Sequence, residues 1–266
     1  MLKNTFRITS IFTGIVLVLF YIALSSGWFG IAQGVGGNFC EDPGNGLILQ
    51  PTNSFSNIGF VLSGISCAWI LSHRTINKTG FFFKHPFIPL FYCLITVLLG
   101  PCSMAMHATE TSLGGLFDMN SMYLFGSFMF AFALARFYNL NSMVFVSIYI
   151  ISLILCNIAG QFRTVFGFNF YAGSAAFGLV CCLGMLFEYL NFKKHKPVVQ
   201  FKYAVFCSIS FLIAFFVWHF GWDGHCFCNP TSLFQWHGVW HLLCALSTFF
   251  LFKYYISEDI SKKGLE

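Results

Sequence analysis

The chain has 266 residues, of which 57% are hydrophobic, 20% aromatic and only 9% charged. With a mean hydropathy of +0.75, this composition excludes a soluble globular domain and predicts an all-α integral membrane protein. The net charge of +5 does not indicate nucleic acid as a partner, because no stretch interleaves basic and aromatic residues as a nucleic-acid groove requires.

A membrane-spanning helix needs about 20 mostly apolar residues. Eight segments meet this condition, at about 9–30, 53–73, 86–107, 117–137, 141–160, 168–190, 201–220 and 233–255. We therefore expect an N-terminal transmembrane anchor (1–31), a seven-transmembrane-helix core (32–256) and a cytoplasmic tail (257–266). The first segment has the basic start of a signal peptide, but its long apolar run and the lack of a small-residue cleavage site favour an uncleaved anchor. Cleavage would leave seven spans in the same orientation.

The Lys and Arg residues predict the orientation of these spans. If the N-terminus is cytoplasmic, 13 of the 14 Lys and Arg residues fall on the cytoplasmic side and only Arg163 falls outside. The positive-inside rule therefore predicts that both termini are cytoplasmic.

Five polar residues interrupt the apolar segments at informative spacings. Ser103 and His107 are four residues apart near the end of the third predicted span, Asp118 opens the fourth, and His237 and His241 are four apart in the last. Side chains at i and i+4 project from one helix face, so His237 and His241 can hold one ion together. On the predicted topology His107, Asp118, His237 and His241 all lie at the outer ends of their helices, so they can converge in one layer.

A pair of His residues with a third His and an acid is typical of zinc, and imidazoles are costly in a bilayer unless they have such a role. Each residue also has an ordinary interpretation. Asp118 alone would cap a helix N-terminus, and Ser103 alone would bond to a helix carbonyl. We expect His219 and His225 to be interfacial residues rather than ligands.

The pattern Ser103-x-x-x-His107, Asp118 eleven residues later and a C-terminal His237-x-x-x-His241 resembles the alkaline ceramidases. Their wider superfamily of seven-span hydrolases includes the adiponectin receptors. The upstream stretch FCEDPGNGLILQPTNSFSNIGF also looks like the family's N-terminal signature, a Cys-Glu segment before an Asn-x-x-Ser-Asn helix start. The resemblance covers residues 38–256 and leaves the extra N-terminal span outside, which indicates a bacterial-type member. It is more specific for the superfamily than for ceramidase activity.

The resemblance implies that His107, His237 and His241 bind zinc, with the fourth position left to water, and that Ser103 and Asp118 are catalytic. The implied reaction is hydrolysis of the amide bond of ceramide or a related lipid within the bilayer. Asp118 would accept the proton of the attacking water, and the Ser103 hydroxyl would stabilise the oxyanion. The alternative is a seven-span receptor-like or signalling protein in which the zinc site is structural.

The resemblance also raises calcium as a second cofactor, because animal alkaline ceramidases carry a calcium site before the first core span. Asn38 stands where an Asp is expected and Gln50 where a Glu is expected, whereas Glu41 is in place. Fewer carboxylates mean weaker calcium binding. Asp42 and Asn45 could compensate, but the default expectation for Glu41–Asn45 is an ordinary Pro-Gly turn without calcium.

Most of the 11 Cys residues fall in apolar spans, where Cys behaves as a small hydrophobic residue. Cys40, Cys226 and Cys228 instead fall in loops predicted to face an oxidising compartment. We therefore expect a disulfide from Cys40 to either Cys226 or Cys228, which would hold the N-terminal segment over the site. Metal binding by the Cys-x-Cys pair is the weaker alternative, because zinc-type Cys spacings are lacking.

Overall fold

The computed structural model describes residues 2–76, 78–162, 164–165, 168–169 and 171–259. Among these described residues, eight helices are long and apolar enough to cross a membrane, which confirms the expected multi-pass helical protein with a seven-helix core and one N-terminal span. Their bounds are α1 Thr5–Ser25, α3 Ile58–His73, α4 Phe87–Thr109, α5 Ser112–Tyr138, α6 Ser142–Ala159, α7 Ala172–His195, α8 Lys202–Trp218 and α9 Trp236–Ile256.

Short elements complete the chain. The six-residue helix α2, Pro51–Ser56, leads into α3, and single 3-10 turns are η1 Leu2–Asn4, η2 Phe81–Phe83 and η3 His219–Gly221. The strands β1, Thr164–Val165, and β2, Phe168–Asn169, form an antiparallel pair.

The predicted bounds of the first, fourth and sixth spans were wrong by four or five residues, and the fourth span begins at Ser112 rather than near residue 117. The span predicted at 168–190 begins only at Ala172, because residues 168–169 belong to β2. The first span ends at Ser25 rather than near residue 30, since Gly27 adopts a φ of 69° that takes the chain out of the helix. Arg163, and Lys262 and Lys263 of the predicted tail, lie outside the described residues.

The chain divides into two compact units. Unit 1 consists of Met1–Asp118 and Val199–Glu258, and unit 2 consists of Met119–Val198 and Asp259–Glu266. All five candidate site residues belong to unit 1, so this unit positions the site.

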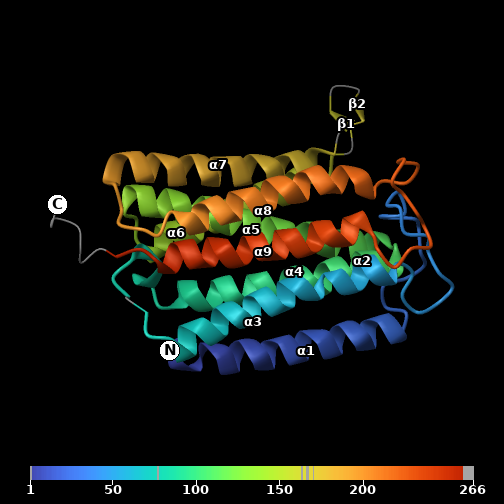
Figure 1. The fold of residues 1–266 in the computed structure, drawn as a ribbon, viewed down its shortest axis with the longest axis horizontal. Helices are drawn as coiled ribbons and strands as arrows, with labels where there is room; N and C mark the ends of the chain where they lie inside the picture. The colour runs from blue at the N-terminus through green and yellow to red at the C-terminus, as the bar shows by residue number, and fades with distance from the viewer. Residues whose placement is uncertain (1, 77, 163, 166–167, 170, 260–266) are drawn as a thin grey trace. The chain divides into compact units, whose positions relative to one another are not determined.

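Within unit 1, α3 packs against α4 and α9, α1 packs against α3 and α4, and α8 packs along α9 (Figure 1). Two glycines allow α3 and α4 to approach closely. A Cβ at Gly64 would lie 2.6 Å from a Val97 methyl, and a Cβ at Gly100 would lie 2.9 Å from the Asn57 carbonyl oxygen. Small residues at helix contacts are typical of membrane proteins, where helix association depends on close packing.

Unit 2 contains the remainder of α5 together with α6, β1, β2 and α7. The helix α6 packs against α7, and Gly126 of α5 lies against Phe177 of α7. A buried ion pair joins Arg136 on α5 to Glu188 on α7. A buried Arg needs such a partner because an uncompensated charge inside a protein is costly.

The segment 26–50 is tied to the end of unit 1 where α4 ends and α9 begins (Figure 1). Leu49 N–H donates to the Ala108 carbonyl at 3.0 Å, and Cys40 N–H donates to the Gly221 carbonyl at 2.8 Å. A disulfide joins Cys40 to Cys228. One of the two expected pairings is thus confirmed, and Cys226 is an exposed free thiol.

Candidate metal centre

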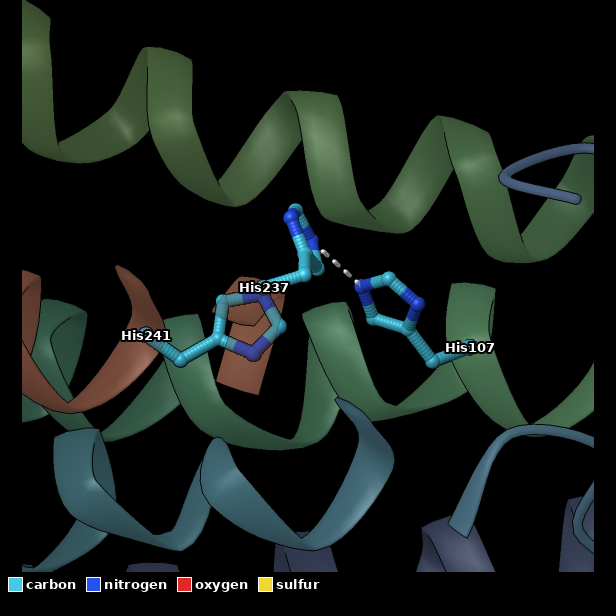
Figure 2. A group of neighbouring side chains, drawn as sticks. All are labelled: His107, His237 and His241. Carbon is cyan, nitrogen blue, oxygen red and sulfur yellow. Dashed lines mark hydrogen bonds between the residues drawn. The ribbon is translucent and has the colours of Figure 1, made fainter. Parts of the chain in front are cut away.

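Three buried histidines converge from two helices of unit 1. His107 lies near the end of α4, whereas His237 and His241 lie in the first two turns of α9, with exposed fractions of 0%, 4% and 4%. Their rings point toward one another, as Figure 2 shows. One ligand nitrogen from each ring lies within 4.8 Å of the other two, and the described residues contain no second group of three or more His, Cys, Asp or Glu side chains placed in this way.

The surrounding hydrogen bonds fix the tautomers of two of these rings. His241 Nδ1 lies 2.8 Å from Ser56 Oγ, and that hydroxyl donates its only proton to the Asn53 carbonyl. Ser56 must therefore accept a hydrogen bond from His241 Nδ1–H. His107 Nδ1 similarly lies 2.8 Å from Gln50 Oε1, which can only accept. Both rings consequently keep the lone pair on Nε2.

The separation of two of these rings matches that of two ligands on a tetrahedral zinc ion. His107 Nε2 and His237 Nε2 are 3.2 Å apart. Two imidazole nitrogens bound to zinc at tetrahedral angles would be about 3.3 Å apart, given zinc–nitrogen bonds of about 2.0–2.1 Å. His237 Nδ1 is buried and has no hydrogen-bond partner in the described part of the chain. If His237 also offered its Nε2 lone pair, three neutral imidazoles would form a typical ligand set that leaves one position open.

Ser103 and Asp118 lie together beside this end of α4. Ser103 is buried one turn before His107, and its hydroxyl donates a hydrogen bond to the partly buried Asp118 carboxylate. The interpretation of Asp118 as a helix cap was wrong, because α5 begins six residues earlier at Ser112. Gly114 lets the start of α5 approach α4, since a Cβ there would lie 2.6 Å from the Ala105 carbonyl oxygen.

An aromatic side chain covers the triad. The Phe39 ring stacks on the His237 ring with a centroid distance of 3.6 Å and an interplanar angle of 24°, and it lies 5.6 Å from the His107 ring. Phe39 is held in place because it forms an isolated β-bridge with Trp222 and precedes the disulfide-bonded Cys40. The disulfide thus helps to hold the N-terminal segment over the histidines.

The segment suspected of binding calcium has a different organisation. Both carboxylate oxygens of Glu41 accept backbone hydrogen bonds of 2.7 Å, from Thr52 N–H and Asn53 N–H at the start of α2. Asp42 and Asn45 are exposed in an irregular loop rather than in the expected turn. Glu41 therefore orders α2, which carries Ser56, the partner of His241.

Gln50 and Ser56 contact the histidines, and sequence reasoning missed this role for both. Gln50 was considered only as a lost calcium ligand, and Ser56 only as part of a helix-start signature. No periodicity links residue 50 to residue 107, because their contact depends on the chain returning between α2 and α4. His219 and His225 do not belong to the triad.

Comparison with known proteins supports a single family. A family model described as Ceramidase matches residues 38–266, which include the triad, Ser103 and Asp118 and leave out α1. No curated protein and no solved structure matches the chain.

Proposed function

The chain belongs to the Ceramidase family, and from that premise we propose that it is a zinc-dependent enzyme cleaving the amide bond of ceramide or a related lipid. Family membership makes it a hydrolase of lipid amides, and its eight apolar helices make it a multi-pass membrane protein. The observation that carries the proposal is the buried convergence of His107, His237 and His241.

Bound zinc would act as a Lewis acid and lower the pKa of water at the fourth position toward neutrality. The two α9 histidines and His107 would hold the ion. The Asp118 carboxylate would act as the general base that accepts the proton of the attacking water, and its carboxyl group would then give that proton to the amine as the carbon–nitrogen bond breaks.

The hydrogen bond between Ser103 and Asp118 suggests an order of events. While Asp118 is ionised, it holds the single Ser103 hydroxyl proton. After Asp118 has taken a proton, its carboxyl group is a weaker acceptor, because hydrogen bonds to charged groups are the stronger ones. The Ser103 hydroxyl then becomes free to donate to the oxyanion that forms at the amide carbonyl.

A structural zinc site, the main alternative, is less well supported. Structural zinc is almost always closed by four protein ligands. The group formed by the described residues has three, and Asp118 is not a member of it. The nearby acid and hydroxyl are the groups that an open, catalytic site requires.

We also place the site on the outer side of the membrane, with both termini cytoplasmic and residues 1–31 forming an uncleaved anchor. The support is the distribution of Lys and Arg, which predicts the end of unit 1 opposite the histidines to be cytoplasmic.

The proposal can be tested by incubating purified full-length protein in lipid nanodiscs with defined lipid amides and lipid esters, followed by mass spectrometry of the products. We expect release of a fatty acid and a sphingoid base from ceramide by the wild type and no release by His237→Ala. His225→Ala is the matched control, since His225 lies in a loop outside the triad, and it should behave as the wild type. The proposal would be overturned if the wild type, shown to contain zinc, formed the same lipid products as His237→Ala.

A further inference from the structure

Gln50 occupies a central position beside the metal centre. Its side chain is completely buried, and it is the residue before α2. Its backbone is fixed as well, because Gln50 N–H donates to the His107 carbonyl at 3.1 Å and the Gln50 carbonyl accepts from Ser54 N–H at 2.8 Å. The Gln50 side chain therefore has little freedom to move relative to the last turn of α4.

The Gln50 carboxamide uses all of its hydrogen-bonding positions. Its Nε2 group donates to Glu110 Oε1 at 2.8 Å and to the Gly36 carbonyl at 3.1 Å. Its Oε1 atom accepts from Asn53 Nδ2 at 3.1 Å and from His107 Nδ1 at 2.8 Å. The opposite amide orientation would place an oxygen against two oxygens, so the network itself assigns the orientation.

Backbone hydrogen bonds hold Glu110, the acceptor of the Gln50 amide group, at the end of α4. It ends α4 with a left-handed φ of 49°, and its backbone carbonyl accepts from Gln33 N–H at 2.9 Å and Val35 N–H at 3.0 Å. The side chain is 5% exposed and lies three residues after His107. A buried carboxylate requires a donor or a cation, and here the Gln50 amide group is a donor to it.

An acidic residue at position 50 would remove the hydrogen-bond donor that Glu110 now has. The carboxylate of a glutamate there would face Glu110 Oε1 and the Gly36 carbonyl with no proton to donate to either. Three converging oxygens of this kind need a cation such as calcium. Glutamine avoids the need, because its NH₂ group lies between the two oxygens.

We propose that Gln50 is a positioning residue for His107, and that its amide group, bound to Glu110 and Gly36, orders the segment around the metal centre without calcium. The proposal rests on the zinc centre proposed above. A hydrogen-bond partner on the second ring nitrogen orients a ligand histidine and typically contributes 10- to 100-fold to metal affinity.

The first test measures zinc affinity by competition with a chelator on purified full-length protein, with bound zinc determined by mass spectrometry. Gln50→Met keeps the side-chain length and removes the amide group, and it should weaken zinc binding by about 10- to 100-fold. Gln235→Met is the matched control, because Gln235 is also buried and donates from Nε2, but only to loop carbonyls such as Ser232 O at 2.8 Å. It should lower thermal stability and leave zinc affinity unchanged.

The second test asks for calcium dependence. The melting temperature of the wild type should be the same with about 1 mM calcium or magnesium, whereas that of Gln50→Glu should rise selectively with calcium. Adding Glu110→Gln to Gln50→Glu removes one of the facing carboxylates and should remove this response.

The outcomes separate the two proposals. Wild type without zinc would refute the metal centre itself. Zinc-loaded wild type together with unchanged affinity in Gln50→Met would refute only the role of Gln50. Selective stabilisation of the wild type by calcium would refute the claim that the Gln50 amide group orders this segment without calcium.

Discussion

The two ends of unit 1 carry opposite charges. At the end that holds the histidines, residues 26–57, 104–118 and 213–241 contain five carboxylates and no Lys or Arg: Glu41, Asp42, Glu110, Asp118 and Asp223. At the opposite end, residues 2–12, 72–91, 199–205 and 249–258 contain one carboxylate, Glu258, and seven basic residues: Lys3, Arg7, Arg74, Lys78, Lys84, Lys202 and Lys253.

This difference determines how the carboxylates at the histidine end are stabilised. Without any Lys or Arg there, hydrogen-bond donors replace ion pairs: Glu41 accepts from two backbone N–H groups, Glu110 from Gln50, and Asp118 from Ser103. The distribution of Lys and Arg that predicts how the spans lie in the membrane thus leaves the end that holds the histidines without basic residues. A metal ion bound by the three neutral histidines would be the main positive charge there.

The largest effect is expected from removing a triad histidine. His107→Ala, His237→Ala or His241→Ala should each reduce bound zinc from about one per chain to nearly none and abolish lipid-amide hydrolysis, because two remaining imidazoles hold zinc poorly. Metal content by mass spectrometry and product release measure both effects. His219→Ala, at the same end of the molecule, is the control that should retain zinc. Stoichiometric zinc in a variant lacking two triad histidines would exclude the assignment.

Asp118→Asn should separate catalysis from metal binding. The substitution keeps the shape of the side chain but removes the base, so zinc should remain while turnover falls by a factor on the order of 10² or more. Ser103→Ala should also retain zinc, with a loss of similar order if its hydroxyl serves the oxyanion. Asp223→Asn, in a loop at the same end, controls for the loss of one negative charge. Joint loss of zinc and activity in Asp118→Asn would instead make the carboxylate a ligand.

A smaller effect is expected from opening the disulfide. Cys40→Ser or Cys228→Ser should lower the free energy of unfolding by about 2–5 kcal/mol, because the bridge closes a long loop. Thermal unfolding in nanodiscs measures the change. The control is Cys226→Ser, which removes a free thiol from the same loop and should leave the melting temperature unchanged. Equal stability of all three variants would show that the hydrogen bonds of segment 26–50 suffice to hold it.

The orientation that the charge comparison predicts can be tested by cysteine labelling at the two ends of unit 1. Cys226 is exposed, so a membrane-impermeant maleimide should label it from the outside of intact cells. Lys78→Cys in the Cys226→Ser background should be labelled only after the membrane is permeabilised. The reverse pattern would invert the proposed orientation.

The sequence determined the parts of this protein that depend on composition and local spacing. Apolar length predicted eight spans, since the bilayer imposes a minimum helix length. The i, i+4 spacing predicted that His237 and His241 share one helix face, and the ordered motif predicted the correct family. Helix ends were less accurate, because Gly27 and the hairpin before α7 act through backbone conformation rather than hydropathy.

Only the tertiary structure decided which partners surround the histidines. It selected Cys228 over Cys226, stacked Phe39 on His237, and joined Gln50 to His107 across 57 positions of sequence. These contacts form where segment 26–50 and α2 return to the ends of α4 and α9. Hydrogen-bond direction and ring tautomer depend on atoms brought together by that return, so neither has a signature in the linear pattern of residues.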